Sequence, residues 1–123
     1  MIRPVGVVAL VITLVAGCGD GSDADATSPP VNGARPVDIR AEALAFEPQV
    51  LTVAAGEDLA VTLVSGDIAH DLTLDESGFR LRVDAGDTDT AALRVDTPGT
   101  YTAYCSIPGH REAGMELTIE AAP

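Results

Sequence analysis

Apolar and polar residues alternate in short runs along most of the chain between residues 37 and 121, and turn-forming residues separate the runs. The alternation has a period of two, which is the spacing of side chains on one face of a β-strand. Strands are predicted over residues 37–45, 50–54, 59–65, 69–75, 79–83, 90–96, 100–105 and 115–121. Several short strands with turn signals between them predict an all-β fold, a Greek-key β-sandwich of about seven or eight strands.

Two aromatic residues have specific places in this prediction. The segment 96–101, Asp-Thr-Pro-Gly-Thr-Tyr, is typical of the corner of a Greek-key sandwich. In such a corner the hydroxyl of Tyr101 bonds to the backbone a few residues upstream. Phe46 precedes a short apolar strand and is expected in the core. The pattern is weakest over residues 76–90, and no helix longer than one or two turns is expected.

The first residues have a different pattern. Arg3 precedes an apolar run from Val5 to Ala16, which is short for a membrane span and typical of a secretory signal. The run ends in Val-Ala-Gly-Cys, which resembles the lipobox of bacterial lipoproteins. Residues 1–17 are therefore predicted to be a lipoprotein signal peptide, with Cys18 as the lipidated first residue of the mature chain. An ordinary signal peptide and a short anchor helix are the alternatives.

Residues 18–36 are predicted to be the lipidated cysteine and a flexible linker, because Gly, Ser, Asp, Ala and Pro dominate them. The folded domain is then expected over residues 37–123. It would be extracytoplasmic and anchored through Cys18 to a bacterial cell membrane. Arginine without lysine, and many alanines and glycines, are typical of a GC-rich bacterial genome.

The formal net charge of −12 restricts the partners. Nucleic acid is excluded because its phosphates would be repelled, and adsorption to an anionic lipid surface is disfavoured for the same reason. A basic protein partner is compatible with this charge, and so is a solvated acidic surface that only keeps the protein soluble. The acidic segment 84–90 lacks the spacing of a calcium loop and is expected to be a solvated turn.

The predicted domain contains four residues that are soft or imidazole ligands: His70, Cys105, His110 and Met115. Two imidazoles, one thiolate and a weak thioether are the ligands of copper in electron-transfer sites. Cys105 ends a predicted strand, His110 lies on the loop after it, and Met115 stands where the next strand begins. One loop therefore supplies three ligands, and His70 would come from a separate strand.

The chain resembles the type I blue copper proteins, or cupredoxins, such as plastocyanin, azurin, halocyanin and rusticyanin. The resemblance lies in LAFEPQVLTVAAGEDLAVTLVSGDIAHDL, in GTYTAYCSIPGHREAGMELTI and in the Cys-x4-His-x4-Met spacing. It implies one copper per domain, with His70, Cys105 and His110 as equatorial ligands and Met115 as the axial ligand. It also implies a monomeric one-electron carrier, not an enzyme, whose partners would be redox proteins such as a cytochrome, an oxidase or a copper reductase.

Two positions depart from the commonest pattern of this family. Many cupredoxins have Asn after the first histidine, where this chain has Asp71, and Asp71 is expected to accept a hydrogen bond from Ser106 beside Cys105. Its negative charge should favour Cu(II) and lower the reduction potential. Glu116 after the axial methionine adds another acid near the loop.

Other functions are weighed against the same residues. A structural zinc site usually has four strong ligands, and a binuclear copper centre would need a second cysteine in the loop. Multicopper oxidases and nitrite reductases need further histidines. Copper delivery or storage remains the alternative, and a β-sandwich scaffold with a vestigial site is the third. The apolar residues around His110 are expected to form a docking face; they are Ile107, Pro108, Gly109, Ala113 and Gly114. Arg111 would lie at the edge of this face, and a simple solvated charge is the alternative for it.

Overall fold

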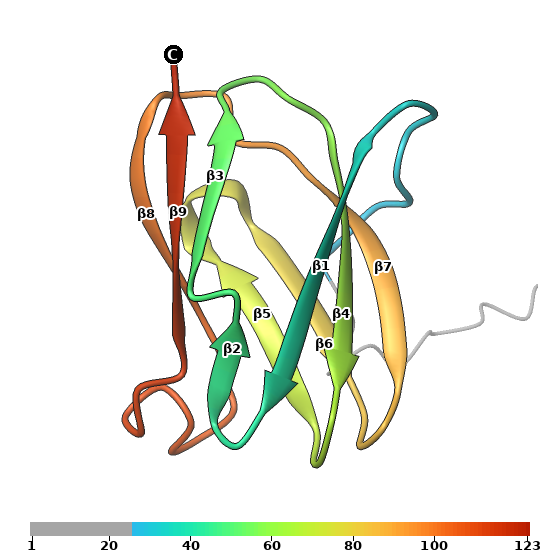
Figure 1. Ribbon diagram of the computed structural model, residues 1–123, viewed down its shortest axis with the longest axis vertical. Helices are drawn as coiled ribbons and strands as arrows, with labels where there is room; N and C mark the ends of the chain where they lie inside the picture. The colour runs from blue at the N-terminus through green and yellow to red at the C-terminus, as the bar shows by residue number, and fades with distance from the viewer. Residues whose placement is uncertain (1–25) are drawn as a thin grey trace, which may run out of the picture.

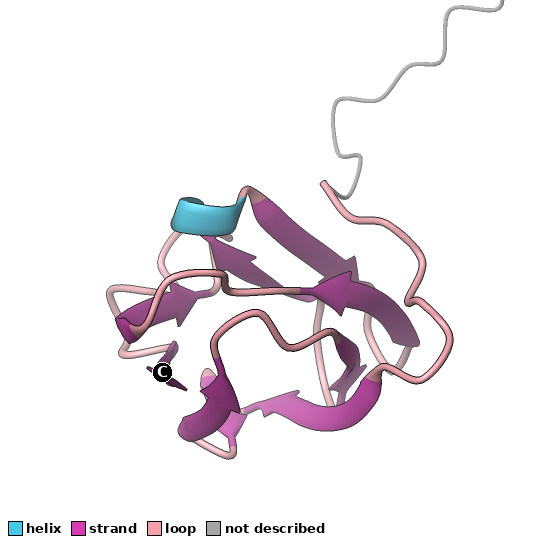
Figure 2. Ribbon diagram, turned by 90° about the horizontal axis from the view of Figure 1, so that it is seen from above, coloured by secondary structure: helices cyan, strands magenta, loops and turns pink. Residues whose placement is uncertain are grey.

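The computed structural model describes residues 26–123, which form two β-sheets packed face to face (Figures 1 and 2). The elements are β1 (Arg35–Glu42), β2 (Ala45–Glu47), β3 (Val50–Ala54), β4 (Leu59–Ser65), β5 (His70–Leu74), the 3-10 turn η1 (Asp75–Ser77), β6 (Phe79–Val83), β7 (Thr88–Leu93), β8 (Gly99–Tyr104) and β9 (Glu116–Ala122). The predicted all-β sandwich is confirmed. The described residues contain one strand more than the eight that the pattern predicts.

The two sheets are mixed and have four and five strands. The order is β2-β1-β4-β7 in the first sheet and β3-β9-β8-β5-β6 in the second. Strands β1 and β4 run parallel, as do β3 and β9, and the other neighbours are antiparallel. The connections β1–β2, β4–β5, β6–β7 and β8–β9 therefore gather at one end, the lower end in Figure 1. This end carries the candidate site.

The additional strand arises from a tight turn inside the predicted strand 37–45. Ala43 and Leu44 have positive φ angles of 52° and 57°, and they join paired Glu42 and Ala45 as a two-residue hairpin. Such turns normally contain Asn or Gly, so alanine and leucine gave no signal in the sequence. A residue from another loop stabilises the turn: the backbone N–H of Ala43 donates to Oδ2 of Asp67, between β4 and β5, at 2.8 Å.

The seventh strand begins earlier than predicted, at Thr88, and ends at Leu93. Its first three residues, Thr88, Asp89 and Thr90, are exposed. Because these three residues are polar, the segment 76–90 lacks the alternation of apolar and polar residues that would have predicted the start of the strand. Pairing with β4, from Leu59 opposite Leu93 to Val64 opposite Thr88, makes this segment a strand.

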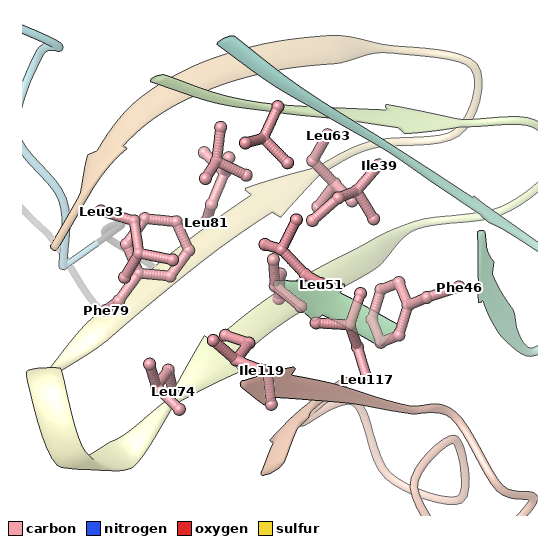
Figure 3. Packing of buried hydrophobic residues seen from close by; sticks show 14 of the residues in the cluster. Ile39, Phe46, Leu51, Leu63, Leu74, Phe79, Leu81, Leu93, Leu117 and Ile119 are labelled. Atoms are coloured by element: carbon pink, nitrogen blue, oxygen red, sulfur yellow. The ribbon is translucent and has the colours of Figure 1, made fainter. Parts of the chain in front are cut away.

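The core lies between the two sheets (Figure 3). Alternate residues of β1 and β4 point into it, with the burial pattern that a period of two predicts. Phe46 is buried there, as expected, and Figure 3 shows it beside Leu117. The Tyr101 hydroxyl donates to the carbonyl of Thr97 at 2.5 Å, which confirms the predicted corner.

Strand β5 is buried along its whole length. Its neighbours β8 and β6 flank it in the sheet. Leu72 and Leu74 belong to the apolar core, whereas Asp71 and Thr73 are buried polar residues on the other face of the strand. A central strand with two covered faces can hold a polar group away from water only if that group finds partners.

The end of the predicted linker contacts the sandwich. The carbonyl of Ala26 accepts from Arg80 N on β6, and the carbonyl of Ser28 accepts from Ala92 N on β7. The segment thus bonds to one edge strand of each sheet, and β1 begins at Arg35 instead of residue 37. The expected signal peptide, 1–17, and Cys18 lie outside the described residues. No helix within residues 26–123 is long and apolar enough to cross a bilayer.

Candidate metal centre

Three predicted ligands converge at the end of the sandwich where the four connections gather. One ligand atom from each of His70, Cys105 and His110 lies within 4.8 Å of the others. His70 begins β5 and Cys105 follows β8, so two adjacent strands of one sheet position them. His70 and Cys105 are buried and His110 is partly exposed. The site is closed on the protein side, with one imidazole near the surface.

The loop between β8 and β9 is folded back on itself by backbone hydrogen bonds. Cys105 N donates to the carbonyl of Met115 at 3.1 Å, and Met115 N donates to the carbonyl of His110 at 3.1 Å. Gly109 and Gly114 have φ angles of 86° and 98°, which a glycine adopts at little cost. The two glycines therefore allow the chain to turn around His110 and return beside Cys105.

The two Nδ1 atoms are the candidate metal-binding nitrogens of the histidines. His110 Nδ1 lies 3.4 Å from Cys105 Sγ. His70 Nδ1 is the single buried side-chain nitrogen or oxygen of residues 26–123 that has no hydrogen-bond partner. A buried polar atom without a partner is costly, and a metal ion bound to this lone pair removes the cost. The donor set therefore fits a metal held by two imidazoles and a thiolate.

Cys105 is completely buried, and this desolvation raises the pKa of its thiol. Hydrogen bonds act in the opposite direction, foremost one from the backbone N–H of Asp71, which lies 3.5 Å from the sulfur. A metal ion replaces the thiol proton and supplies the positive charge that the thiolate requires.

Met115 is fully buried and directly precedes β9. Its backbone bonds to both Cys105 and His110 keep it at the base of the ligand loop. This placement is compatible with a weak axial contact. Its role as a ligand stays a prediction.

Asp71 and Ser106 are joined as the sequence predicts, and by two hydrogen bonds. Asp71 Oδ1 accepts the backbone N–H of Ser106 at 2.7 Å, and Asp71 Oδ2 accepts the Ser106 hydroxyl. Thr73 Oγ1 also donates to Oδ1 at 3.1 Å. The buried carboxylate thus ties β5 to the residue after Cys105.

Asp67 belongs to the site but is absent from the residues that the sequence singles out. Its Oδ1 lies 2.6 Å from His70 Nε2 and accepts the N–H of Ile68 at 2.7 Å. The backbone hydrogen bond from Ala43 lowers the pKa of Asp67 most, followed by bonds from His70 and Ile68, and together they bring it to about 2. The sequence signal for Asp67 was an acid three residues before a predicted ligand histidine. It was not decisive, because the segment Ser65-Gly66-Asp67 is equally typical of an ordinary turn.

Arg111 does not stand alone at the edge of the site. Its guanidinium lies over the ring of Tyr104, 3.9 Å from the centroid, and its Nε is 3.1 Å from Glu116 Oε1. Glu116, expected only as an added acid near the loop, is therefore paired with Arg111.

The surface near the two histidines includes apolar residues. Ile68, two residues before His70, has half of its surface exposed, and it was not among the predicted residues of the docking face. Pro108, Gly109, Ala113 and Gly114 are exposed, and Ile107 is partly buried against the core.

Known proteins resemble this chain in sequence and in fold. Residues 34–122 match the profile of the family described as "Copper binding proteins, plastocyanin/azurin family". Plastocyanin of Ulva arasakii is 34% identical over 87 residues, covering 63% of this chain and 86% of that protein. A solved structure of auracyanin B superposes with a TM-score of 0.68 at 24% identity, over 80% of this chain and 98% of that one. The solved structure of the "blue" copper protein auracyanin A of Chloroflexus aurantiacus superposes with a TM-score of 0.64 at 18% identity, over 73% of this chain and 100% of that one.

Sandwich and site together define a copper protein of the cupredoxin class, with the two histidines and the cysteine as its candidate metal-binding group. The chain belongs to the plastocyanin/azurin family of copper-binding proteins. Copper is therefore the metal that the donor set is built to hold.

Proposed function

We propose that this protein carries single electrons between extracytoplasmic redox partners while tethered to a bacterial membrane through Cys18. Copper at His70, Cys105 and His110, with Met115 as a weak axial ligand, would alternate between Cu(II) and Cu(I). The observation that carries the proposal is the convergence of one ligand atom each from His70, Cys105 and His110 within 4.8 Å, together with the buried, unpartnered Nδ1 of His70.

The ligand set suits both oxidation states of copper. Thiolate and thioether favour Cu(I), whereas imidazoles bind either state. His70 and Cys105 are held by adjacent strands of the sandwich, so the scaffold limits how far the ligands move when the oxidation state changes. Small movement means a small reorganisation cost, which is what rapid electron exchange requires.

The proposed partners are redox proteins such as a cytochrome, an oxidase or a copper reductase. His110 is partly exposed and lies among the exposed apolar residues of the ligand loop. Weak redox encounters need only a small interface, so a modest apolar surface around one imidazole is enough for a monomer to dock. The net charge of −12 is compatible with a basic surface on the partner.

Membrane tethering rests on the sequence of the first eighteen residues, Val-Ala-Gly-Cys following an apolar run. A lipid on Cys18 and the linker after it would keep the domain near the membrane and leave it free to reach partners.

The two cysteines of the chain provide a matched pair of variants. Cys105→Ser and Cys18→Ser each replace one thiol by a hydroxyl. With one equivalent of Cu(II), the purified protein is expected to show an intense visible thiolate-to-copper band that ascorbate bleaches reversibly. Cys105→Ser should lose this band and keep lipid labelling and membrane association, whereas Cys18→Ser should keep the band and lose both.

Other outcomes separate the parts of the proposal. Absence of the band in the wild-type protein, with binding of Cu(I) alone, would move the function to copper delivery or storage. Membrane association that persists in Cys18→Ser would refute the lipid anchor and leave the electron carrier intact.

A further inference from the structure

We infer that Asp67 is a positioning residue for copper, which holds His70 in the one tautomer that presents Nδ1 to the metal. Asp67 Oδ1 lies 2.6 Å from His70 Nε2, and the imidazole is fully buried. A carboxylate at this distance accepts a hydrogen bond from a protonated Nε2. His70 Nε2 therefore carries the proton and donates it in this hydrogen bond, and Nδ1 keeps its lone pair. The inference deepens the proposed function, on which its consequence for copper rests.

The geometry excludes the opposite assignment. If Nδ1 carried the proton, the buried N–H would have no acceptor, because Nδ1 has no partner among the described residues. At the same time the Nε2 lone pair would face the lone pairs of Asp67, 2.6 Å away. Both arrangements are unfavourable, so Asp67 selects the tautomer before any metal binds.

Asp67 is itself held in place by two backbone groups. Its Oδ2 accepts the N–H of Ala43, and its Oδ1 accepts the N–H of Ile68. Ala43 and Leu44 form the β1–β2 turn and have positive φ angles, and the N–H of Ala43 lies 2.8 Å from the carboxylate. The turn of one sheet therefore braces a carboxylate that orients a ligand in the other sheet.

The carboxylate also changes what the imidazole offers to copper. A histidine that donates its second N–H to a carboxylate is a more basic ligand than one that donates to water. A more basic imidazole stabilises Cu(II) more than Cu(I), so Asp67 lowers the reduction potential. Loss of such an outer partner typically costs about 10–100-fold in metal affinity.

The experiment compares Asp67→Ala and Asp67→Asn with Asp38→Asn in the full chain. Asn has one acceptor oxygen where the carboxylate has two, so it cannot serve His70 Nε2, Ala43 N and Ile68 N as Asp67 does. Asp38→Asn removes the same charge from an exposed position on β1 and controls for net charge. The readouts are ¹⁵N chemical shifts of His70 in the metal-free protein near pH 8, Cu(II) affinity and midpoint potential.

In the wild-type protein and in Asp38→Asn, His70 should show a protonated Nε2 and a bare Nδ1. In Asp67→Ala the two tautomers should mix, Cu(II) affinity should fall by about 10-fold or more, and the potential should rise. Asp67→Asn should fold and raise the potential more than Asp38→Asn does.

A protonated Nδ1 in the wild type, or a tautomer unchanged in Asp67→Ala, would overturn the inference. The tautomer is measured without metal, so this result stands apart from the proposed function, which fails instead if the wild type shows no thiolate-to-copper band.

Discussion

The buried carboxylate of Asp71 lies 3.6 Å from the guanidinium of Arg80 on the neighbouring strand β6. Asp71 is fully buried, whereas 39% of the Arg80 side chain is exposed. A buried carboxylate normally needs hydrogen bonds and a countercharge, and here Ser106 and Thr73 supply the former and Arg80 the latter. Arg80 therefore offsets the charge that aspartate introduces where many cupredoxins have asparagine.

Arg80→Gln is expected to lower the midpoint potential of copper, because the uncompensated charge of Asp71 favours Cu(II). It should also reduce the free energy of unfolding of the metal-free protein by about 1 kcal/mol, a small value because Arg80 is partly exposed. Voltammetry and urea unfolding measure the two effects.

The control for Arg80 is a double-mutant cycle with Asp71→Asn. In the Asp71→Asn background, Arg80→Gln should leave the potential unchanged, since no carboxylate remains to be compensated. An equal shift in both backgrounds would show that Arg80 acts on copper without Asp71.

Met115→Leu should remain folded and blue but gain a higher reduction potential. Leucine nearly conserves the buried volume, so the cost in unfolding free energy should stay below about 1.5 kcal/mol. It removes the proposed fourth, axial ligand, and Cu(I) accepts the remaining three-coordinate site more readily than Cu(II) does, which outweighs the preference of the soft thioether itself for Cu(I). Absorption spectra and voltammetry test this, and an unchanged potential would argue that Met115 only fills the core.

The thiol of Cys105 should be masked in the metal-free protein. It is fully buried, and burial raises its pKa above the ordinary value of about 8.5, so the reactive thiolate is scarce at neutral pH. Alkylation by iodoacetamide near pH 7.5 should be slow in the folded Cys18→Ser variant and fast in urea. Reaction at the same rate with and without urea would show that the closed site opens readily.

Tyr101→Phe separates stability from redox properties. It removes the hydrogen bond to the Thr97 carbonyl and should cost about 1 kcal/mol of unfolding free energy. The midpoint potential should not move, because Tyr101 lies near the start of β8 and bonds to Thr97, whereas Cys105 follows the end of that strand. A shifted potential would mean that the corner influences the copper end through the sheet.

Prediction from sequence worked where a pattern is local. Strand β4 alternates buried and partly exposed residues along its length, and the alternate apolar residues Val61 and Leu63 were enough to predict it. It failed where pairing with another strand decides the structure. The first, polar residues of β7 form a strand because they pair with β4. The β1–β2 turn lies at Ala43 and Leu44, although neither is a usual turn residue.

The site divides in the same way. His70, Cys105, His110 and Met115 were identified because the domain has no other soft or imidazole ligand. Asp71 and Ser106 were identified because the resemblance to cupredoxins implies a hydrogen bond between the residues that follow the first histidine and the cysteine. Asp67 and Arg80 were not. Each acts through a contact that depends on the fold: Asp67 links Ala43 to His70, and Arg80 reaches Asp71 across two paired strands.

The sequence by itself determined the strand pattern, the ligand types and their spacing, because these follow from side-chain chemistry and from the period of a strand. Tertiary structure alone decided which nitrogen of His70 is free, what orients that imidazole and what balances the buried charge of Asp71. Those properties depend on distances of a few ångströms between segments far apart in the chain, and only the packing of the two sheets sets them.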